Sequence, residues 1–66
     1  MKADRVEVSW DNQKGKWLVR IVVGEEVIRR YAGESKNADE TKLRAAAAKT
    51  AVDEGYEVDA GNVILK

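Results

Sequence analysis

The 66-residue sequence contains no cysteine, no histidine and no proline. Without cysteine, the chain can form neither a disulfide nor a thiolate metal site, and it has no cysteine nucleophile. Without histidine, it lacks the usual general base at neutral pH and the commonest zinc ligand. We therefore expect a protein that is not an enzyme and that has no catalytic residue, metal ion or cofactor.

Charge of one sign and long apolar runs are also missing. The chain has 12 Lys+Arg against 12 Asp+Glu, whereas a module that binds duplex nucleic acid usually shows a basic excess. No apolar run approaches the roughly 18 residues of a membrane span, and the first residues lack the apolar stretch of a signal peptide. The expectation is one small domain over residues 1–66, cytoplasmic and without membrane contact.

Three segments have the composition of β-strands. Residues 5–10 alternate apolar and polar side chains, residues 17–23 are mostly β-branched or aromatic, and residues 26–32 continue the pattern. Polar turn formers separate the first two segments, and Gly24-Glu25 suits a two-residue type II′ turn before the third. The pattern predicts an antiparallel meander.

A helix is predicted over residues 38–54, where alanine and other strong helix formers dominate. Asn37 is the expected N-cap and Gly55 the expected stop. One helical face is apolar and consists of Leu43, Ala47, Ala48, Ala51 and Val52. Its small alanines would let the helix lie close to a sheet that carries two tryptophans.

The C-terminal residues allow two interpretations. Residues 59–62 could turn a small hairpin, or residues 63–65 could add a last strand to the main sheet. The predicted fold class is therefore α+β, with a three- to four-stranded antiparallel sheet, one helix packed on one face and the order β-β-β-α-β. An extra C-terminal strand stays open at this point.

One helix covers only one face of such a sheet. If Gly24-Glu25 forms a two-residue turn, Arg20 faces Arg29 on the uncovered face, and a three-residue turn would instead pair Arg20 with Arg30. Both registers set like charges opposite each other, which is mildly unfavourable. Glu7 could supply the compensating charge from within the chain, or an external phosphate or carboxylate could.

The uncovered face should also carry a contiguous apolar patch, of the kind that tends to mark a binding surface. Its members are Leu18, Val22, Val27 and Tyr31. A chain of this length buries only about 60% of its unfolded surface, so pairing with a copy of itself would add stability. Alternatively, the C-terminal segment folds back over the patch. Our leading hypothesis is a non-catalytic interaction module that binds a protein partner, or itself, through this patch.

Nucleic-acid binding is the alternative hypothesis. The candidate contacts are Arg20, Arg29, Arg30, Lys14 and Lys16. Trp10 and Trp17 would stack on bases if exposed, but core anchorage is the more ordinary role for such a pair. A cluster of carboxylates, whose spacing fits no metal loop, predicts an acidic C-terminal edge. It consists of Asp53, Glu54, Glu57 and Asp59.

The run from Gly15 to Arg20 (Gly-Lys-Trp-Leu-Val-Arg), the glycine-led second hairpin and Thr41-Lys42 ahead of Ala45 resemble two groups of small domains. One is a set of short bacterial β-β-β-α-β proteins of unknown function with a Gly-x-Trp-x-Val strand, which implies no activity. The other, more distant, is the arm-type DNA-binding domain of tyrosine-type phage integrases, which lays a three-stranded sheet in the major groove. That resemblance would make the three candidate arginines DNA contacts.

The likeness covers roughly residues 15–58. An integrase arm is normally basic and ends at its helix, whereas this chain is neutral and continues through an apolar tail at residues 63–65. The first group fits the tail better.

Overall fold

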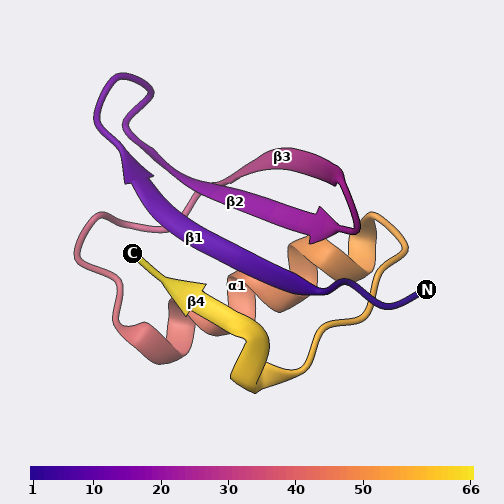
Figure 1. Ribbon diagram of the computed structural model, residues 1–66. Coiled ribbons are helices and arrows are strands. Elements are labelled where there is room, and N and C mark those ends of the chain that lie inside the picture. Colours follow the sequence, from indigo (N-terminus) through magenta and orange to yellow (C-terminus); the bar gives the residue numbers. More distant parts are fainter.

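The chain folds into a four-stranded sheet with a helix across one face (Figure 1). The computed structural model describes the backbone of residues 1–66 and every side chain except that of Ala60. In chain order, the elements are β1 (Arg5–Asp11), β2 (Lys16–Val23), β3 (Glu26–Ala32), α1 (Glu40–Asp53), the 3₁₀ helix η1 (Ala60–Asn62) and β4 (Val63–Leu65). The predicted α+β class and the order β-β-β-α-β are confirmed.

The β2–β3 hairpin has the register expected for a two-residue turn. Gly24 has φ +60°, and no non-glycine residue of the described backbone has a positive φ, so the turn has the left-handed first position of type II′. Arg20 consequently pairs with Arg29, and the three-residue alternative that pairs it with Arg30 is wrong.

The fourth strand corrects one part of the prediction, because β4 runs parallel to β1 rather than antiparallel. Figure 1 shows the cause: α1 carries the chain back to the end of the sheet where β1 begins, so β4 sets out in the same direction as β1. The sheet order is β3-β2-β1-β4. Of the two interpretations of the C-terminal residues, the added strand at residues 63–65 is confirmed, and the hairpin at residues 59–62 is wrong because η1 leads directly into β4.

The helix begins two residues later than expected. The N-cap is Asp39, whose side chain accepts a hydrogen bond from the Lys42 backbone N–H at 2.8 Å, and not Asn37. Aspartate and asparagine are comparable caps, so composition alone does not separate them. At the other end Gly55 has φ +90°, as expected for the residue that ends a helix. No helix of the described chain is long and apolar enough to span a lipid bilayer.

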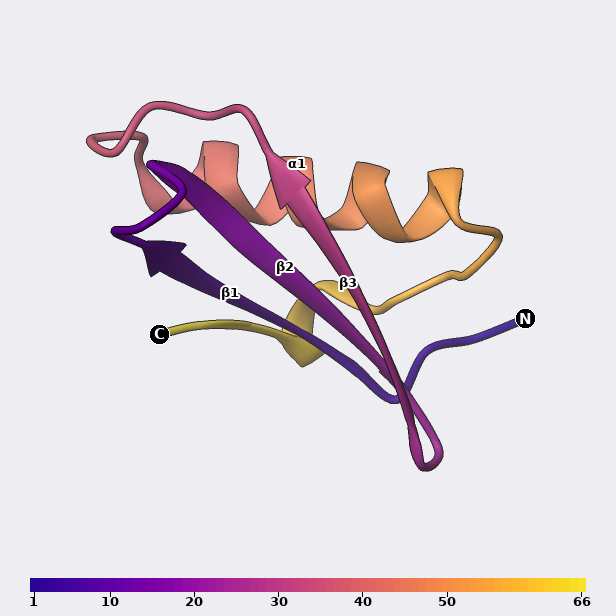
Figure 2. The same ribbon diagram turned by 90° about the horizontal axis from the view of Figure 1, so that it is seen from above.

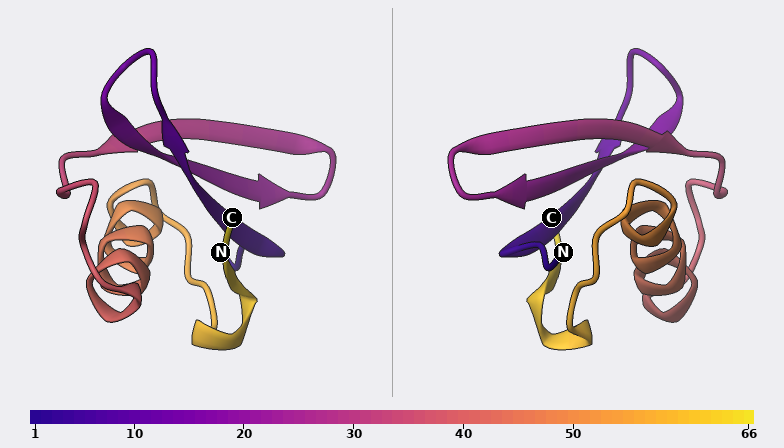
Figure 3. Two further views of the ribbon diagram at one scale, coloured as in Figure 1. Left: turned by 90° about the vertical axis from the view of Figure 1, so that its left-hand side faces the viewer. Right: turned by 90° about the vertical axis from the view of Figure 1, so that its right-hand side faces the viewer.

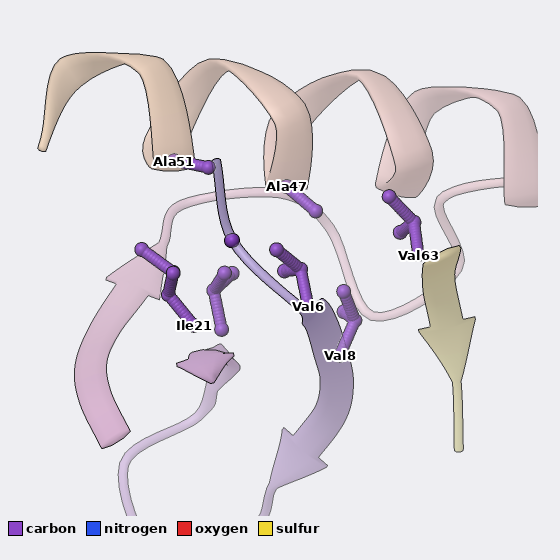
Figure 4. Close-up of a cluster of buried hydrophobic side chains, with 8 residues drawn as sticks. Val6, Val8, Ile21, Ala47, Ala51 and Val63 are labelled. Atoms are coloured by element: carbon purple, nitrogen blue, oxygen red, sulfur yellow. The ribbon is translucent and has the colours of Figure 1, made fainter. Parts of the chain in front are cut away.

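The core lies between α1 and the sheet. In Figure 4, alanine side chains of the helix face valine and isoleucine side chains of the strands. The buried cluster consists of Ala3, Val6, Val8, Val19, Ile21, Ala47, Ala51 and Val63. Ala47 and Ala51 have no exposed surface, which confirms that these two alanines of the predicted helical face pack against the sheet. Val52, which the sequence pattern places on this face, is instead 61% exposed. It lies at the rim of the contact between α1 and the sheet.

Candidate functional site

The face of the sheet turned away from α1, here called the open face, is covered by no other element of the described chain (Figures 2 and 3). Alternation of side chains along the strands, combined with the register, arranges its residues in rows across β3, β2 and β1. The first row is Val27, Val22 and Arg5; the second is Arg29, Arg20 and Glu7; the third is Tyr31, Leu18 and Ser9. A charged row therefore lies between two apolar pairs.

This arrangement corrects the expectation of one contiguous apolar patch. Val22 is only 5% exposed, Leu18 and Val27 are half-buried, and Tyr31 is 45% exposed. The Arg20–Arg29 pair separates Val22 and Val27 from Leu18 and Tyr31. The C-terminal segment does not cover these residues, because β4 joins the sheet beside β1, and both β1 and β2 lie between β4 and β3.

Glu7 is the centre of an ion-pair cluster on the open face. Its carboxylate accepts hydrogen bonds from Arg5 Nε and Arg20 Nη1, each at 3.1 Å, and Lys66 Nζ lies 3.4 Å away. The Arg5 hydrogen bond is the main reason that the pKa of Glu7 falls below its usual range, although burial, with 8% of the residue exposed, opposes the shift. Glu7 thus supplies the internal compensating charge for Arg20.

Arg29 is placed differently from Arg20. No ion pair or side-chain hydrogen bond holds its guanidinium within the described structure, although Arg20 lies directly opposite it. The Nε of Arg20 is itself buried without a hydrogen-bond partner among the described atoms. The charged row is therefore compensated at its β1 end and uncompensated at its β3 end.

Tyr31 reaches across β2 to β1. Its hydroxyl donates to Asp11 Oδ2 at 3.2 Å, and Asp11 Oδ1 accepts the backbone N–H groups of Gln13 and Lys14. Burial of the hydroxyl and this hydrogen bond raise the pKa of Tyr31, whereas the Lys14 backbone bond is the main cause of the lowered pKa of Asp11. The Tyr31 ring is held over the sheet by this anchor.

The structure divides the candidate nucleic-acid contacts. Arg20, Arg29 and Lys16 share the open face, and Lys14 belongs to the turn between β1 and β2. Arg30 points to the opposite side, where Nη2 pairs with Glu54 Oε1 at 2.8 Å. The alternation of side chains along β3 separates Arg30 from Arg29, so the five cations do not form one surface.

The tryptophans lie on the α1 side of the sheet. Their rings meet edge to face at 5.3 Å between centroids, and Trp17 packs against the core while its Nε1 donates to the Ser35 carbonyl at 2.8 Å. Trp10 lies at the rim, with Lys36 Nζ 5.7 Å from its ring centroid. The predicted core role is confirmed for Trp17. Trp10 instead contacts the ring of Trp17 at the border of the core.

The predicted acidic edge is partly neutralised. Glu54 pairs with Arg30, and Asp59 Oδ2 lies 2.9 Å from Lys2 Nζ. No three acidic side chains of the described residues are grouped so as to hold a metal ion.

Several open-face residues were not identified from the sequence. Arg5 and Asp11 could have been found, because they occupy alternate positions on β1 with Glu7. Two further residues, Ile64 and Lys66, could not have been found, because their placement depends on the parallel pairing of β4 with β1. Ile64 lies beside Glu7 and is 40% exposed.

Comparisons of the chain with family models, with curated proteins and with solved structures find no match. Both resemblances drawn from the sequence therefore remain predictions.

Proposed function

We propose that this chain is a non-catalytic interaction domain that binds a protein partner through the open face. The observation that carries the proposal is the position of Leu18, Val27 and Tyr31, which are apolar and accessible on the face opposite α1. Partly exposed apolar groups around a charged centre are typical of the surfaces that proteins use to recognise one another. The proposal includes a cytoplasmic location, which the composition suggests and cell fractionation would test.

A second copy of the chain is the less favourable partner. The open face carries the cations Arg5, Lys16, Arg20, Arg29 and Lys66 against the carboxylates Glu7 and Asp11, an excess of three positive charges. Two such faces would repel each other when brought together. The proposal is therefore association with a different protein.

Nucleic-acid binding remains the alternative proposal, supported by the same positive excess. The aliphatic members of the face argue for protein instead, because leucine and valine offer no ring on which a base can stack. Tyr31 is the single aromatic residue at the candidate face. Titration with labelled duplex and single-stranded oligonucleotides at low salt tests the alternative, because a mainly electrostatic site would bind there most strongly.

The primary test is a selection of binding peptides from a random display library, followed by mapping of amide chemical shifts on the ¹⁵N-labelled chain. We expect the shifts to concentrate at Leu18, Val27 and Tyr31. The variant Val27→Ser should weaken binding, and the matched control Val52→Ser, which alters an exposed valine on α1, should not. Binding that maps to α1, or the absence of any specific peptide, would contradict the proposal.

A further inference from the structure

The order of the open-face rows specifies more than an apolar surface. Along β3 the open-face side chains are Val27, Arg29 and Tyr31, and along β2 they are Val22, Arg20 and Leu18. Both strands therefore present a cation between two apolar groups. Neighbouring rows are separated by two residues of a strand, roughly 6.5–7 Å.

A chain in extended conformation has the same spacing between alternate side chains. We propose that the open face binds an extended acidic segment of a partner protein, in which one carboxylate lies between two apolar residues at alternate positions. The carboxylate binds at the Arg20–Arg29 pair, and the apolar residues pack on Val27 at one side and on Leu18 and Tyr31 at the other. This inference rests on the proposed function and adds the chemistry of the partner.

The arginine pair gives the first argument for an anion. Like charges that lie directly opposite each other on neighbouring strands destabilise a sheet, as Arg20 and Arg29 do here. Glu7 forms an ion pair with Arg20 but not with Arg29. A carboxylate at Arg29 would form a charge-assisted bond with a cation that is otherwise uncompensated. Because apolar residues flank the pair on both sides, binding would also remove water from it and strengthen the bond.

The second argument concerns the outer edge of β3, where a partner segment could otherwise pair as a further strand. A side-chain contact obstructs that edge, so the segment is expected to bind on the open face instead. In this hairpin Val27, Arg29 and Tyr31 turn their backbone N–H and C=O groups toward the outer edge. The middle carbonyl, that of Arg29, already accepts a hydrogen bond from Arg30 Nη1 at 2.7 Å. Glu54 holds the same Arg30 guanidinium through Nη2. This contact obstructs the addition of a further strand at the centre of the edge.

The test compares two selected peptides that differ only in the central residue, glutamate or glutamine, with the wild-type chain and Arg29→Gln. Isothermal titration should give about fivefold to tenfold tighter binding of the glutamate peptide to the wild type. Arg29→Gln should abolish that preference and leave the affinity for the glutamine peptide unchanged. Lys49→Gln, which removes an exposed cation on α1, is the control and should keep the preference.

Three outcomes would overturn the inference, and they separate it from the proposed function. Peptides that bind the open face without preference for glutamate would contradict the acidic partner and leave the interaction domain intact. Peptides that bind elsewhere would contradict both. Oligonucleotides that bind at Arg29, when no peptide does, would replace the acidic segment with nucleic acid.

Discussion

Arg20 and Arg29 lie directly opposite each other on β2 and β3, and Glu7 forms an ion pair with only the first of them. The two-residue turn at Gly24 fixes this register, so the juxtaposition follows from local turn geometry rather than from side-chain attraction. The backbone therefore imposes a pair of like charges, of which only Arg20 has a compensating carboxylate. The open face is organised around this pair.

Glu7→Gln should destabilise the fold. The substitution removes the negative charge that Arg5, Arg20 and Lys66 share, and we expect a loss of about 1–2 kcal/mol in the free energy of unfolding. Urea denaturation followed by tryptophan fluorescence measures it. Glu25→Gln, at an exposed turn position, is the control and should change stability by less than about 0.5 kcal/mol. Equal effects of the two substitutions would show that the cluster contributes nothing.

The same carboxylate predicts how stability depends on pH. Because the folded-state pKa of Glu7 lies below the ordinary value of 4.5, its contribution is present in full above pH 4.5 and is lost as pH falls through the lowered pKa. Unfolding free energies of the wild type should therefore decline below pH 4.5 more steeply than those of Glu7→Gln. Parallel pH profiles for the two proteins would contradict the assignment.

Ala47→Leu should be costly because Ala47 is fully buried where α1 approaches the sheet. Inserting a larger side chain into a filled core typically costs about 1–3 kcal/mol. Ala45→Leu on the exposed side of the same helix is the matched control and should be close to neutral, since alanine and leucine have similar helix propensities. Thermal unfolding followed by circular dichroism distinguishes the two. A neutral Ala47→Leu would mean that the helix packs through another face.

The parallel strand β4 is tested by two neighbouring residues. Val63 is 3% exposed and faces the core, whereas Ile64 is 40% exposed on the open face. Val63→Ala should reduce stability by about 2 kcal/mol, and Ile64→Ala by clearly less. Urea midpoints measure both. The reverse order of effects would imply that β4 pairs in a register shifted by one residue.

The sequence predicts those parts of the fold that depend on neighbours along the chain. The register of β2 and β3 follows from a glycine-led turn, and the buried alanines follow from helical periodicity. The direction of β4 does not, because three apolar residues at positions 63–65 carry no information about which strand they join. Val52 shows the limit of the helical pattern, since the rotation of α1 over a narrow sheet decides which residues at the rim are buried.

The candidate site was predicted in part for the same reasons. The identities of its apolar residues and of Arg20 and Arg29 follow from alternation along two strands. Their order in rows needed the register, whereas the placement of Arg30 on the face opposite Arg29 follows from alternation along β3 alone. Lys66 reaches Glu7 only because β4 lies beside β1, so that contact depended on the complete fold.

The central claim is that one face of this sheet is left accessible for a partner. NMR spectra of the methyl-labelled chain, recorded with a neutral soluble nitroxide, test this claim directly. The nitroxide broadens the signals of methyl groups that are accessible to solvent. We predict strong broadening for the methyl groups of Leu18 and Val27 on the open face, and little for Val19 and Ile21, which lie on the α1 side of the same sheet. Equal protection of all four residues would contradict the account, because it would mean that the open face is already covered in solution.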